Sequence, residues 1–355
     1  MTNPSYQRII DAPERERRDL FVATARRVGT TEQNVEKDFW VSWTLDVLFH
    51  RLPSGGPRLL FKGGTSLSKA FGLINRFSED IDVTVFRDDL GESVTLEELE
   101  RLSGKQRQKR LDAIKTACQS YINGQLRTQL TDVVVHALAN EKPEVATARV
   151  VADDTDPDGQ TLLLRYPSVL STDPYVQPAV RIESGAKSAL DPHVAATIEP
   201  YVEAEVVDPG LTVSGITTIE AARTFWDKVI ILHGLRRWFE NRSALRQEGQ
   251  RVTRHYYDVH SIMKTEVGSR AISNLAMADE CARHARMFFD RPDFNLHLAI
   301  PGTFALVASH PMLERLRPDY DNMAGMILGV IPAFDDVMAS VADLEARLNG
   351  SSTPA

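Results

Sequence analysis

The stretch FKGGTSLSKAFGLINRFSEDIDVTVF, residues 61–86, decides the fold of this chain. A short apolar run, residues 59–61, meets the paired glycines Gly63 and Gly64, and this pattern predicts a buried strand followed by a tight turn. Residues 65–73 carry apolar side chains at helical spacing, whereas residues 81–86 are β-branched and predict a second strand. The segment therefore predicts strand, glycine turn, helix and strand in immediate succession.

Two aspartates, Asp80 and Asp82, stand at the start of the second strand. Side chains two residues apart on a strand point to the same face, and two carboxylates that close are unfavourable unless a cation lies between them. Hard oxygen ligands suit Mg²⁺ (or Mn²⁺), which completes its shell with substrate phosphates. Backbone N–H groups of Gly63, Gly64 and Thr65 can approach such phosphates. We expect a site for metal and nucleoside triphosphate; a solvated acidic strand beside an ordinary glycine turn is the alternative.

The N-terminal half contains further helices and strands around this segment. Residues 14–50 predict two helices, with Thr30 or Thr31 as a cap, and residues 94–128 predict a polar helix. Residues 145–151 and 162–166 flank an Asp-Pro-Asp-Gly turn and predict a hairpin. Residues 180–183 predict one more short strand.

The C-terminal half is almost entirely helical in pattern from about residue 217. Thr217 and Glu220 predict a capping box for the helix that follows. We place a domain boundary near residue 210, which divides the chain into a core, 1–210, and a helical domain, 211–350, before a disordered tail, 351–355. The fold class is α+β, a small mixed sheet with flanking helices followed by a mainly helical half.

Composition is that of an ordinary globular protein, with 355 residues, 43% hydrophobic and 25% charged. Since the chain has no apolar run of membrane-spanning length and begins with charged residues, we expect a cytoplasmic protein without membrane contact. Cys118 and Cys281 fit neither a disulfide framework nor a zinc site, and we expect both to be buried.

A basic segment, residues 236–254, stands out in a chain whose net charge is −8. It contains six arginines and two acids. The net charge argues against nucleic-acid binding over the whole surface, but it leaves room for a local basic patch. The segment is either a solvated helix face with a loop or a surface that faces phosphates.

The glycine turn followed by Asp-x-Asp is similar to the signature of the DNA polymerase β nucleotidyltransferase superfamily. The fuller pattern resembles the AbiEii/AbiGii branch of bacterial toxin and phage-defence proteins, from about residue 30 to residue 330. The segments that carry the resemblance are Lys62-Gly-Gly-Thr65 with Leu67, Lys69, Arg76, Ser78, Asp80 and Asp82; Glu36-Lys-Asp-Phe-Trp-Val41; Val180-Arg-Ile-Glu183 with 185–188; Trp226-Asp-Lys228; Tyr257-Asp258; and 316–323.

The resemblance implies transfer of a nucleotidyl group from an NTP to an acceptor, with release of pyrophosphate. The 3′ end of tRNA is the leading RNA acceptor; a protein acceptor also fits the residues. The resemblance further implies a cognate antitoxin with a winged-helix DNA-binding part, which often acts without a tight complex with the toxin. Two other functions remain open: a catalytically silent protein that binds nucleotide or RNA, and a phosphohydrolase or kinase-like enzyme that uses the same metal pair.

Two residues of the helical half acquire roles through the resemblance. Lys228 lies in a mostly buried helix, where a lysine must extend to solvent or meet an anion, and the matching lysine of the family faces the triphosphate. Asp258 matches the final acid of the family, although an acid on a helix is more often solvated. Many relatives carry a further acid where this chain has His255, which puts a role for that position in doubt.

The remaining candidates are each open to two interpretations. Glu183 is either the third carboxylate beside Asp80 and Asp82 or a partner of Arg181 or Lys187. Ser78 contacts phosphate or ends the preceding turn. Lys62, like Lys69, binds phosphate or is an ordinary surface lysine. Asp258 or Glu183 orients or deprotonates the acceptor.

Overall fold

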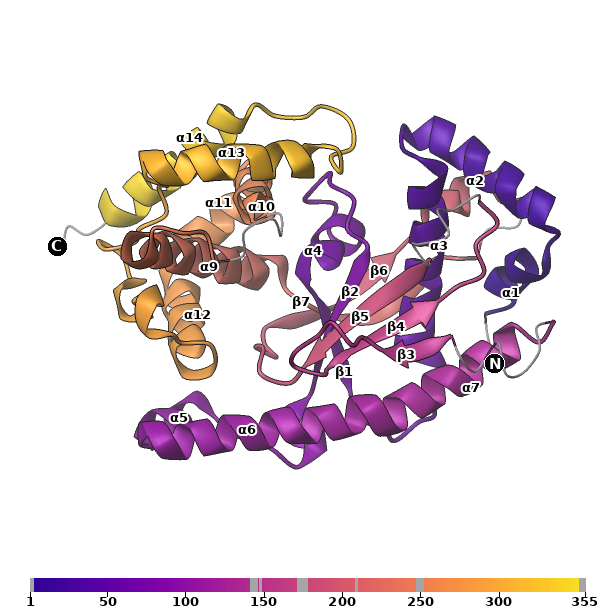
Figure 1. Cartoon of the computed structure of the whole chain (residues 1–355), viewed down its shortest axis with the longest axis horizontal. Helices are drawn as coiled ribbons and strands as arrows, with labels where there is room; N and C mark the ends of the chain where they lie inside the picture. The colour runs from indigo at the N-terminus through magenta and orange to yellow at the C-terminus, as the bar shows by residue number, and fades with distance from the viewer. Residues whose placement is uncertain are drawn as a thin grey trace. The chain divides into compact units, whose positions relative to one another are not determined.

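The computed structural model describes residues 3–140, 146, 149–170, 178–207, 210–246 and 252–350. The chain divides into two compact units (Figure 1). Unit 1 comprises Met1–Phe71, Phe77–Val94 and Leu102–Ile219, and unit 2 comprises Gly72–Arg76, Thr95–Arg101 and Glu220–Ala355. The predicted disordered tail, 351–355, and part of the basic segment, 247–251, lie outside the described residues.

Unit 1 is built on one seven-stranded mixed sheet with the order β3-β4-β5-β2-β1-β7-β6. The pairs β1–β7 and β2–β5 are parallel, and the other pairs are antiparallel. The predicted α+β class with a mixed sheet is thus confirmed. The strands are β1 (Leu59–Lys62), β2 (Asp80–Val85), β3 (Val150–Ala152), β4 (Thr161–Arg165), β5 (Ala179–Gly185), β6 (His193–Ile198) and β7 (Val213–Ile219).

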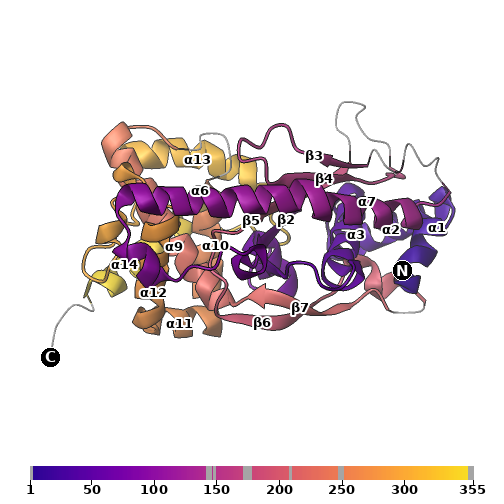
Figure 2. The ribbon, with the colours of Figure 1, turned by 90° about the horizontal axis from the view of Figure 1, so that it is seen from below.

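Helices and helical turns complete unit 1. Figure 2 shows α6 continuing through η4 into α7 as one long helix. The helical elements are α1 (Pro4–Asp11), α2 (Glu14–Val28), α3 (Glu32–Asp46), η1 (Val47–Arg51), α4 (Gly63–Thr65), η2 (Ser66–Ala70), η3 (Arg87–Leu90), α6 (Gly104–Tyr121), η4 (Ile122–Leu126), α7 (Arg127–Ala137) and η5 (Tyr201–Glu205).

The strand β2 places its apolar side chains in the core and its acidic side chains on the opposite, polar face of the sheet. Ile81, Val83 and Val85 are fully buried, whereas Asp80 and Asp82 alternate with them and remain partly exposed. Strand side chains alternate between faces, so burial of the β-branched residues holds both carboxylates on the opposite face. The helix α3 packs against β2, β5 and β7, and its N-terminus is capped by the predicted Thr31, which accepts a hydrogen bond from the backbone of Asn34.

Of three local predictions, the structure confirms the first, contradicts the second and corrects the length of the third. The hairpin is confirmed, since β3 and β4 pair antiparallel. The capping box of Thr217 and Glu220 is wrong: Thr217 pairs with Ala195 inside the β6–β7 ladder, and the N-cap Glu220 makes no side-chain capping bond. Residues 213–219 are rich in β-branched side chains, which favour a strand there. The helix after the glycine turn is shorter than predicted, because η2 ends at Ala70.

Unit 2 is helical. Its core is apolar, with Trp226, Leu316 and Val337 among the fully buried side chains. Its elements are α5 (Leu96–Arg101), α9 (Ala221–Arg242), α10 (Thr253–Met263), α11 (Glu266–Ser273), α12 (Leu275–Phe288), η6 (Pro292–Phe294), η7 (Leu296–Leu298), α13 (His310–Ala324) and α14 (Phe334–Gly350).

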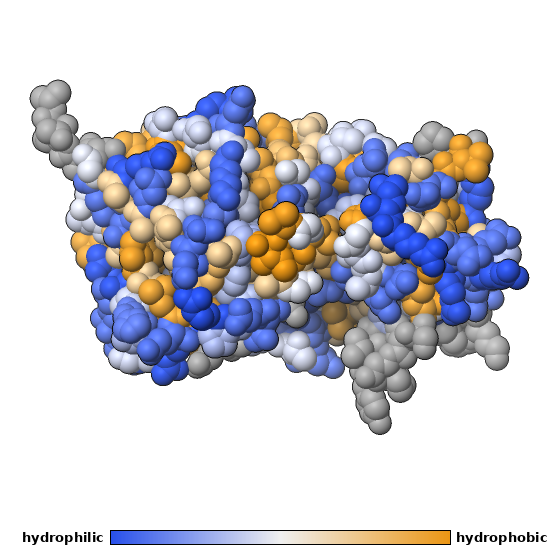
Figure 3. All heavy atoms as spheres, turned by 90° about the horizontal axis from the view of Figure 1, so that it is seen from above, coloured by the Kyte–Doolittle hydropathy of each residue, from blue (hydrophilic) through white to orange (hydrophobic). Residues whose placement is uncertain are grey.

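The face seen in Figure 3 carries hydrophilic residues interspersed with apolar patches. Among the described residues, no helix is both long and apolar enough to cross a membrane. Both cysteines are buried and free, as predicted.

Candidate active site

Three acidic side chains share the polar face of the sheet in unit 1. Asp82 on β2 lies in parallel register with Glu183 on β5, and Asp80 lies two residues earlier on the same strand. On the other side of β2, Lys62 of β1 lies opposite Asp82, and its Nζ is 3.8 Å from Asp82 Oδ1. Residues in register on neighbouring strands point to the same face, so the sheet itself gathers these four side chains.

The glycine turn lies directly against Asp82. Gly63 has a φ of 79°, in the left-handed region, and a Cβ added there would lie 1.9 Å from Asp82 Oδ2. Only glycine permits both this backbone conformation and this close approach. The turn and the carboxylate therefore form one structural unit, as the spacing of the sequence predicts.

The helix that follows the turn is attached to β2 by hydroxyl groups. The buried Thr65 hydroxyl donates to the backbone carbonyl of Asp80 over 2.5 Å and lies 2.9 Å from the Ser78 hydroxyl. Thr65 thereby fixes the position of the strand at the residue that carries the first carboxylate. These bonds occupy the Thr65 side chain, so a contact of this residue with phosphate would use its backbone N–H.

The carboxylates repel one another at this face. Burial, followed by the negative charges of Glu183, Glu79 and Asp82, raises the pKa of Asp80 to about 6, and the positive charge of Lys37 opposes the rise. Crowded carboxylates of this kind are stabilised when a cation binds between them.

The residues present fit a divalent cation. Within the described ranges, no three His, Cys, Asp or Glu side chains already stand together as a ligand set. A magnesium ion needs only one or two carboxylates, because water and substrate phosphates supply its other ligands. Asp80 and Asp82 provide such a pair of hard oxygen ligands on one face.

Glu183 is held by a cation as well as by its place beside Asp82. Arg181 Nε lies 3.0 Å from Glu183 Oε1, and the Glu183 side chain is 43% exposed. The structure therefore combines the two interpretations of this residue. Glu183 is next to the aspartate pair, and it is also paired with Arg181.

Lys37 is a neighbour of the site that the sequence analysis included only as part of a family motif. Its Nζ lies 3.3 Å from Glu79 Oε2, one residue before Asp80. The flanking acids of α3 have other partners: Glu36 accepts from Ser168 and from the backbone of Val169, and Asp38 pairs with Lys69.

The two acids therefore anchor α3, and Lys37 between them reaches the carboxylates. Asp38 also accepts a bond from the backbone of Tyr201, over 2.7 Å. Lys69 is buried in this pair and lies over the Tyr201 ring, so it is a structural cation rather than a surface lysine. The sequence could have pointed to Lys37, because it lies between two acids, and the side chains of both acids are used in contacts that hold α3.

A second charged cluster lies within unit 2. Asp258 is completely buried and accepts bonds from Arg76 Nε and Nη2, at 2.7 and 2.9 Å. Lys228 Nζ lies 2.7 Å from Asp258 Oδ2. Although burial favours the neutral acid, the positive charges of Arg76 and Lys228 hold the pKa of Asp258 well below its usual range.

His255 lies beside this cluster. Burial, followed by the positive charges of Lys228 and Arg254, lowers the pKa of His255 well below its usual value, so its imidazole is neutral. The cluster brings together two residues predicted for the site, Lys228 and Asp258. It also includes Arg76, which the sequence analysis had placed only in the family motif.

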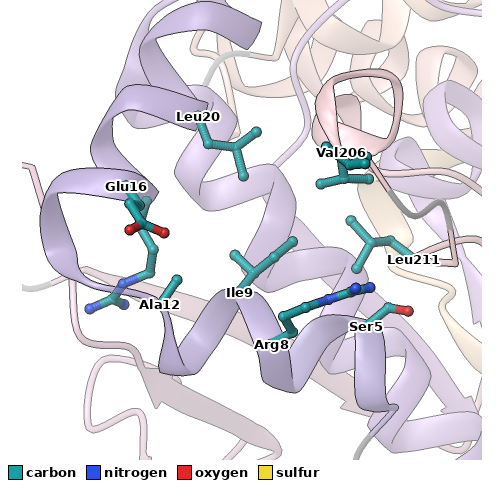
Figure 4. Close-up of a pocket in the computed structure, with 10 residues that line it drawn as sticks. Ser5, Arg8, Ile9, Ala12, Glu16, Leu20, Val206 and Leu211 are labelled. Carbon is teal, nitrogen blue, oxygen red and sulfur yellow. The ribbon is translucent and has the colours of Figure 1, made fainter.

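A pocket of about 260 Å³ lies elsewhere in unit 1 (Figure 4). It is formed by α1, α2 and the segment around Val206 and Leu211, and its lining is mainly apolar. None of the residues that the sequence analysis selected for the site lines it.

The family model of the nucleotidyl transferase AbiEii toxin, type IV toxin–antitoxin system, matches residues 46–340. Among solved structures, the chain is similar to MenT4, a nucleotidyltransferase toxin from Mycobacterium tuberculosis H37Rv, with 16% identity, a TM-score of 0.49 and coverage of 94% of this chain and 90% of that chain. No curated protein matches. Because the family model spans most of the sequence, the chain belongs to the AbiEii nucleotidyltransferase toxin family.

Proposed function

We propose that this protein is a magnesium-dependent nucleotidyltransferase toxin that transfers a nucleotidyl group from an NTP to RNA, with the 3′ end of tRNA as the leading acceptor. The observation that carries the proposal is the acidic face of unit 1, where Asp82 is in register with Glu183, two residues from Asp80 and against the Gly63 turn. Type IV membership supports a cognate antitoxin as its partner. We place its action in the cytoplasm.

In this mechanism Asp80 and Asp82 would hold the metal. When bound, such an ion would supply Lewis-acid polarisation of the α-phosphate and positive charge beside the leaving pyrophosphate. Backbone groups of the Gly63-Gly64-Thr65 turn hold the phosphates, and Lys62 and Ser78 line the same part of the sheet face and turn.

The group transfer itself needs one proton acceptor. The acceptor hydroxyl attacks the α-phosphorus, the bond to the oxygen that bridges to the β-phosphate breaks, and pyrophosphate leaves. We assign the proton of that hydroxyl to Glu183, which is partly exposed and lies next to Asp82. No covalent enzyme intermediate is required.

Asp258 has a different role in this proposal. A buried carboxylate that already accepts bonds from Arg76 and Lys228, and whose pKa lies well below its usual range, is a poor proton acceptor near neutral pH. We assign it as a positioning residue that holds Lys228 and Arg76 together. The role in triphosphate binding that the family resemblance implies for Lys228 remains a prediction.

The alternative is a silent member of the family that binds nucleotide or RNA without turnover. Such a protein would be expected to have lost an aspartate of Asp80-Ile-Asp82 or the lysine at 228, and this chain retains all three. A phosphohydrolase would release inorganic phosphate instead of pyrophosphate.

The test is an incubation with total RNA, Mg²⁺ and each NTP in turn, labelled at the α-phosphate, beside an Asp80→Ala control. Label on RNA with the wild type alone supports the proposal and identifies both nucleotide and acceptor. Pyrophosphate without labelled RNA contradicts the RNA acceptor and directs the search to protein or small molecules. Nucleotide binding without any turnover supports the silent alternative.

A further inference from the structure

A group of arginines and aromatic rings lies at the C-terminal end of α9, within unit 2. It consists of Trp238, Arg242, Arg246, Arg291 and Phe294, here called the Arg–aromatic surface. Trp238 and Phe294 are partly exposed, with ring centroids 6.0 Å apart, and the three arginines are exposed. Arg242 lies over Trp238, with its Cζ 5.6 Å from the ring centroid, and Arg246 lies over Phe294 at 5.0 Å.

The fold holds these rings in place. The Phe294 ring packs closely against Gly234 of α9, because a Cβ at that glycine would lie 3.3 Å from the ring. Asn295, the next residue, is fixed through its carbonyl oxygen, which lies 3.2 Å from His233 Nε2. The position of the Phe294 ring is therefore set by its packing against α9.

The backbone on both sides of the Arg–aromatic surface is unusual. Among the described residues, Ser243 and Asn295 are the only non-glycine residues with positive φ, at 52° and 47°. Ser243 directly follows Arg242, and Asn295 directly follows Phe294. Both residues are C-caps, Ser243 of α9 and Asn295 of η6, and the left-handed conformation ends each helix at the edge of the Arg–aromatic surface.

The charges of the surface are only partly compensated. Arg242 pairs with Asp293, with Nη2 2.7 Å from Oδ2, but neither Arg246 nor Arg291 has an ion-pair partner among the residues that the structure describes. Burial and the neighbouring charge of Arg291 lower the pKa of Arg246. Two neighbouring guanidinium groups without a carboxylate favour an anionic ligand.

We propose that the Arg–aromatic surface binds a single-stranded segment of the RNA acceptor. Guanidinium groups stacked on aromatic rings offer planes on which unpaired bases stack, and the uncompensated arginines meet the phosphates. A duplex hides its base faces and cannot use these planes. The inference rests on the proposed RNA acceptor. Within the basic segment, it assigns Arg242 and Arg246 to the phosphate-facing alternative.

The experiment measures binding of a fluorescent 12-nucleotide single-stranded RNA of mixed sequence by anisotropy, without NTP or Mg²⁺, in the Asp80→Ala background. Trp238→Ala and the double variant Arg246→Ala/Arg291→Ala are each expected to raise Kd about tenfold, and Trp238→Phe to restore binding. The double arginine variant should also flatten the slope of log Kd against log salt by about one.

The matched control is Arg317→Ala, which also removes an arginine that lies over an aromatic ring and pairs with an aspartate in unit 2. Its Kd should stay within about twofold of the parent, since surface charges away from a binding site contribute little. Equal Kd values for the parent and the surface variants, or equal affinity for a duplex of the same length, would overturn the inference.

Failure of this inference and failure of the proposed function are distinguishable. If the wild type labels RNA and the surface variants bind RNA normally, the surface assignment alone is wrong. If the surface variants lose RNA binding but the wild type transfers no nucleotide, the surface assignment stands and the catalytic proposal is wrong. Circular dichroism confirms that each variant is folded.

Discussion

At the scale of single residues, Gly63 joins the turn that we propose to hold the phosphates to the aspartates that we propose to hold the metal. Gly63→Ala must displace Asp82, because the new Cβ would lie 1.9 Å from its Oδ2. A displacement of about 1 Å at a reacting centre costs on the order of 100-fold in rate, so we expect kcat to fall by that amount.

The control for this substitution is Gly55→Ala. Gly55 also has a positive φ, 88°, but a Cβ there meets nothing within 4 Å. This variant should lose about 1 kcal/mol of stability and keep its activity. Equal rates for the two variants would show that the contact with Asp82 is unimportant.

Asp80 provides a prediction about stability and pH. Its pKa in the folded chain is raised from 3.8 to about 6, so ionisation opposes folding as pH rises from about 4 to 6, and the cost is fully present above that range. In EDTA, Asp80→Asn should therefore stabilise the protein by up to about 3 kcal/mol at pH 7.5 and have little effect at pH 4.

Thermal unfolding at the two pH values measures this difference. The exposed Asp19→Asn, which removes an equal charge from α2, is the control for the loss of a negative charge. If Asp80→Asn changes the melting temperature equally at pH 4 and pH 7.5, burial and the neighbouring carboxylates do not raise the pKa of Asp80 as described.

At the scale of elements, α3 acts as a rigid support that presents Lys37 to the acidic face. The substitution Lys37→Met removes the positive charge of Lys37. It should raise the pKa of Asp80 further, because Lys37 favours the ionised form of that aspartate. The acidic limb of the pH profile of kcat/KM should then move up by about half to one pH unit, and Lys37→Arg should restore it.

Lys115→Met is the matched control, since Lys115 pairs with Asp158 and not with the carboxylates of the sheet face. Its pH profile should coincide with that of the wild type. A Lys37→Met profile that falls in height without moving along the pH axis would mean that the lysine supports the fold alone.

The strands show which parts of the fold the sequence could predict. β1, β2 and β5 could be predicted because each is a short apolar run. Each run also lies next to glycines or acids, and these have a clear chemical role at that place. β6 and β7 were not, because β6 is mostly exposed and β7 directly precedes α9. The predicted capping box at Thr217 was wrong because a short polar pattern does not outweigh pairing with a neighbouring strand. Only the tertiary structure supplies that pairing.

The residues of the candidate site also divide into those that the sequence predicts and those that only the folded structure brings together. Asp80 and Asp82 were predictable from local spacing, and Gly63 from the turn. The register of Glu183 with Asp82, the salt bridge of Lys37 with Glu79 and the bidentate bond of Arg76 to Asp258 join segments far apart in sequence or contacts set by packing. Spacing along the chain does not contain such information.

At the scale of the whole molecule, each compact unit contains its own charged cluster. In unit 2, the buried carboxylate of Asp258 satisfies two cations, so Asp258→Asn should destabilise the protein by about 3 kcal/mol. A double-mutant cycle with Arg76→Met should give a coupling free energy above about 1 kcal/mol in chemical unfolding.

The exposed pair Arg317–Asp335 serves as the reference for this cycle, with an expected coupling below about 1 kcal/mol. Additive effects of Arg76→Met and Asp258→Asn would contradict the positioning role of Asp258. A coupled loss of stability is expected even in the absence of nucleotide.

The most direct test of the central claim compares two positions of the label in the same NTP. The protein is incubated with Mg²⁺, RNA and the NTP labelled either at the α-phosphate or at the γ-phosphate. Nucleotidyl transfer predicts label on the acceptor from the α-phosphate only, with release of pyrophosphate. Label on the acceptor from the γ-phosphate, or release of inorganic phosphate alone, would contradict the account.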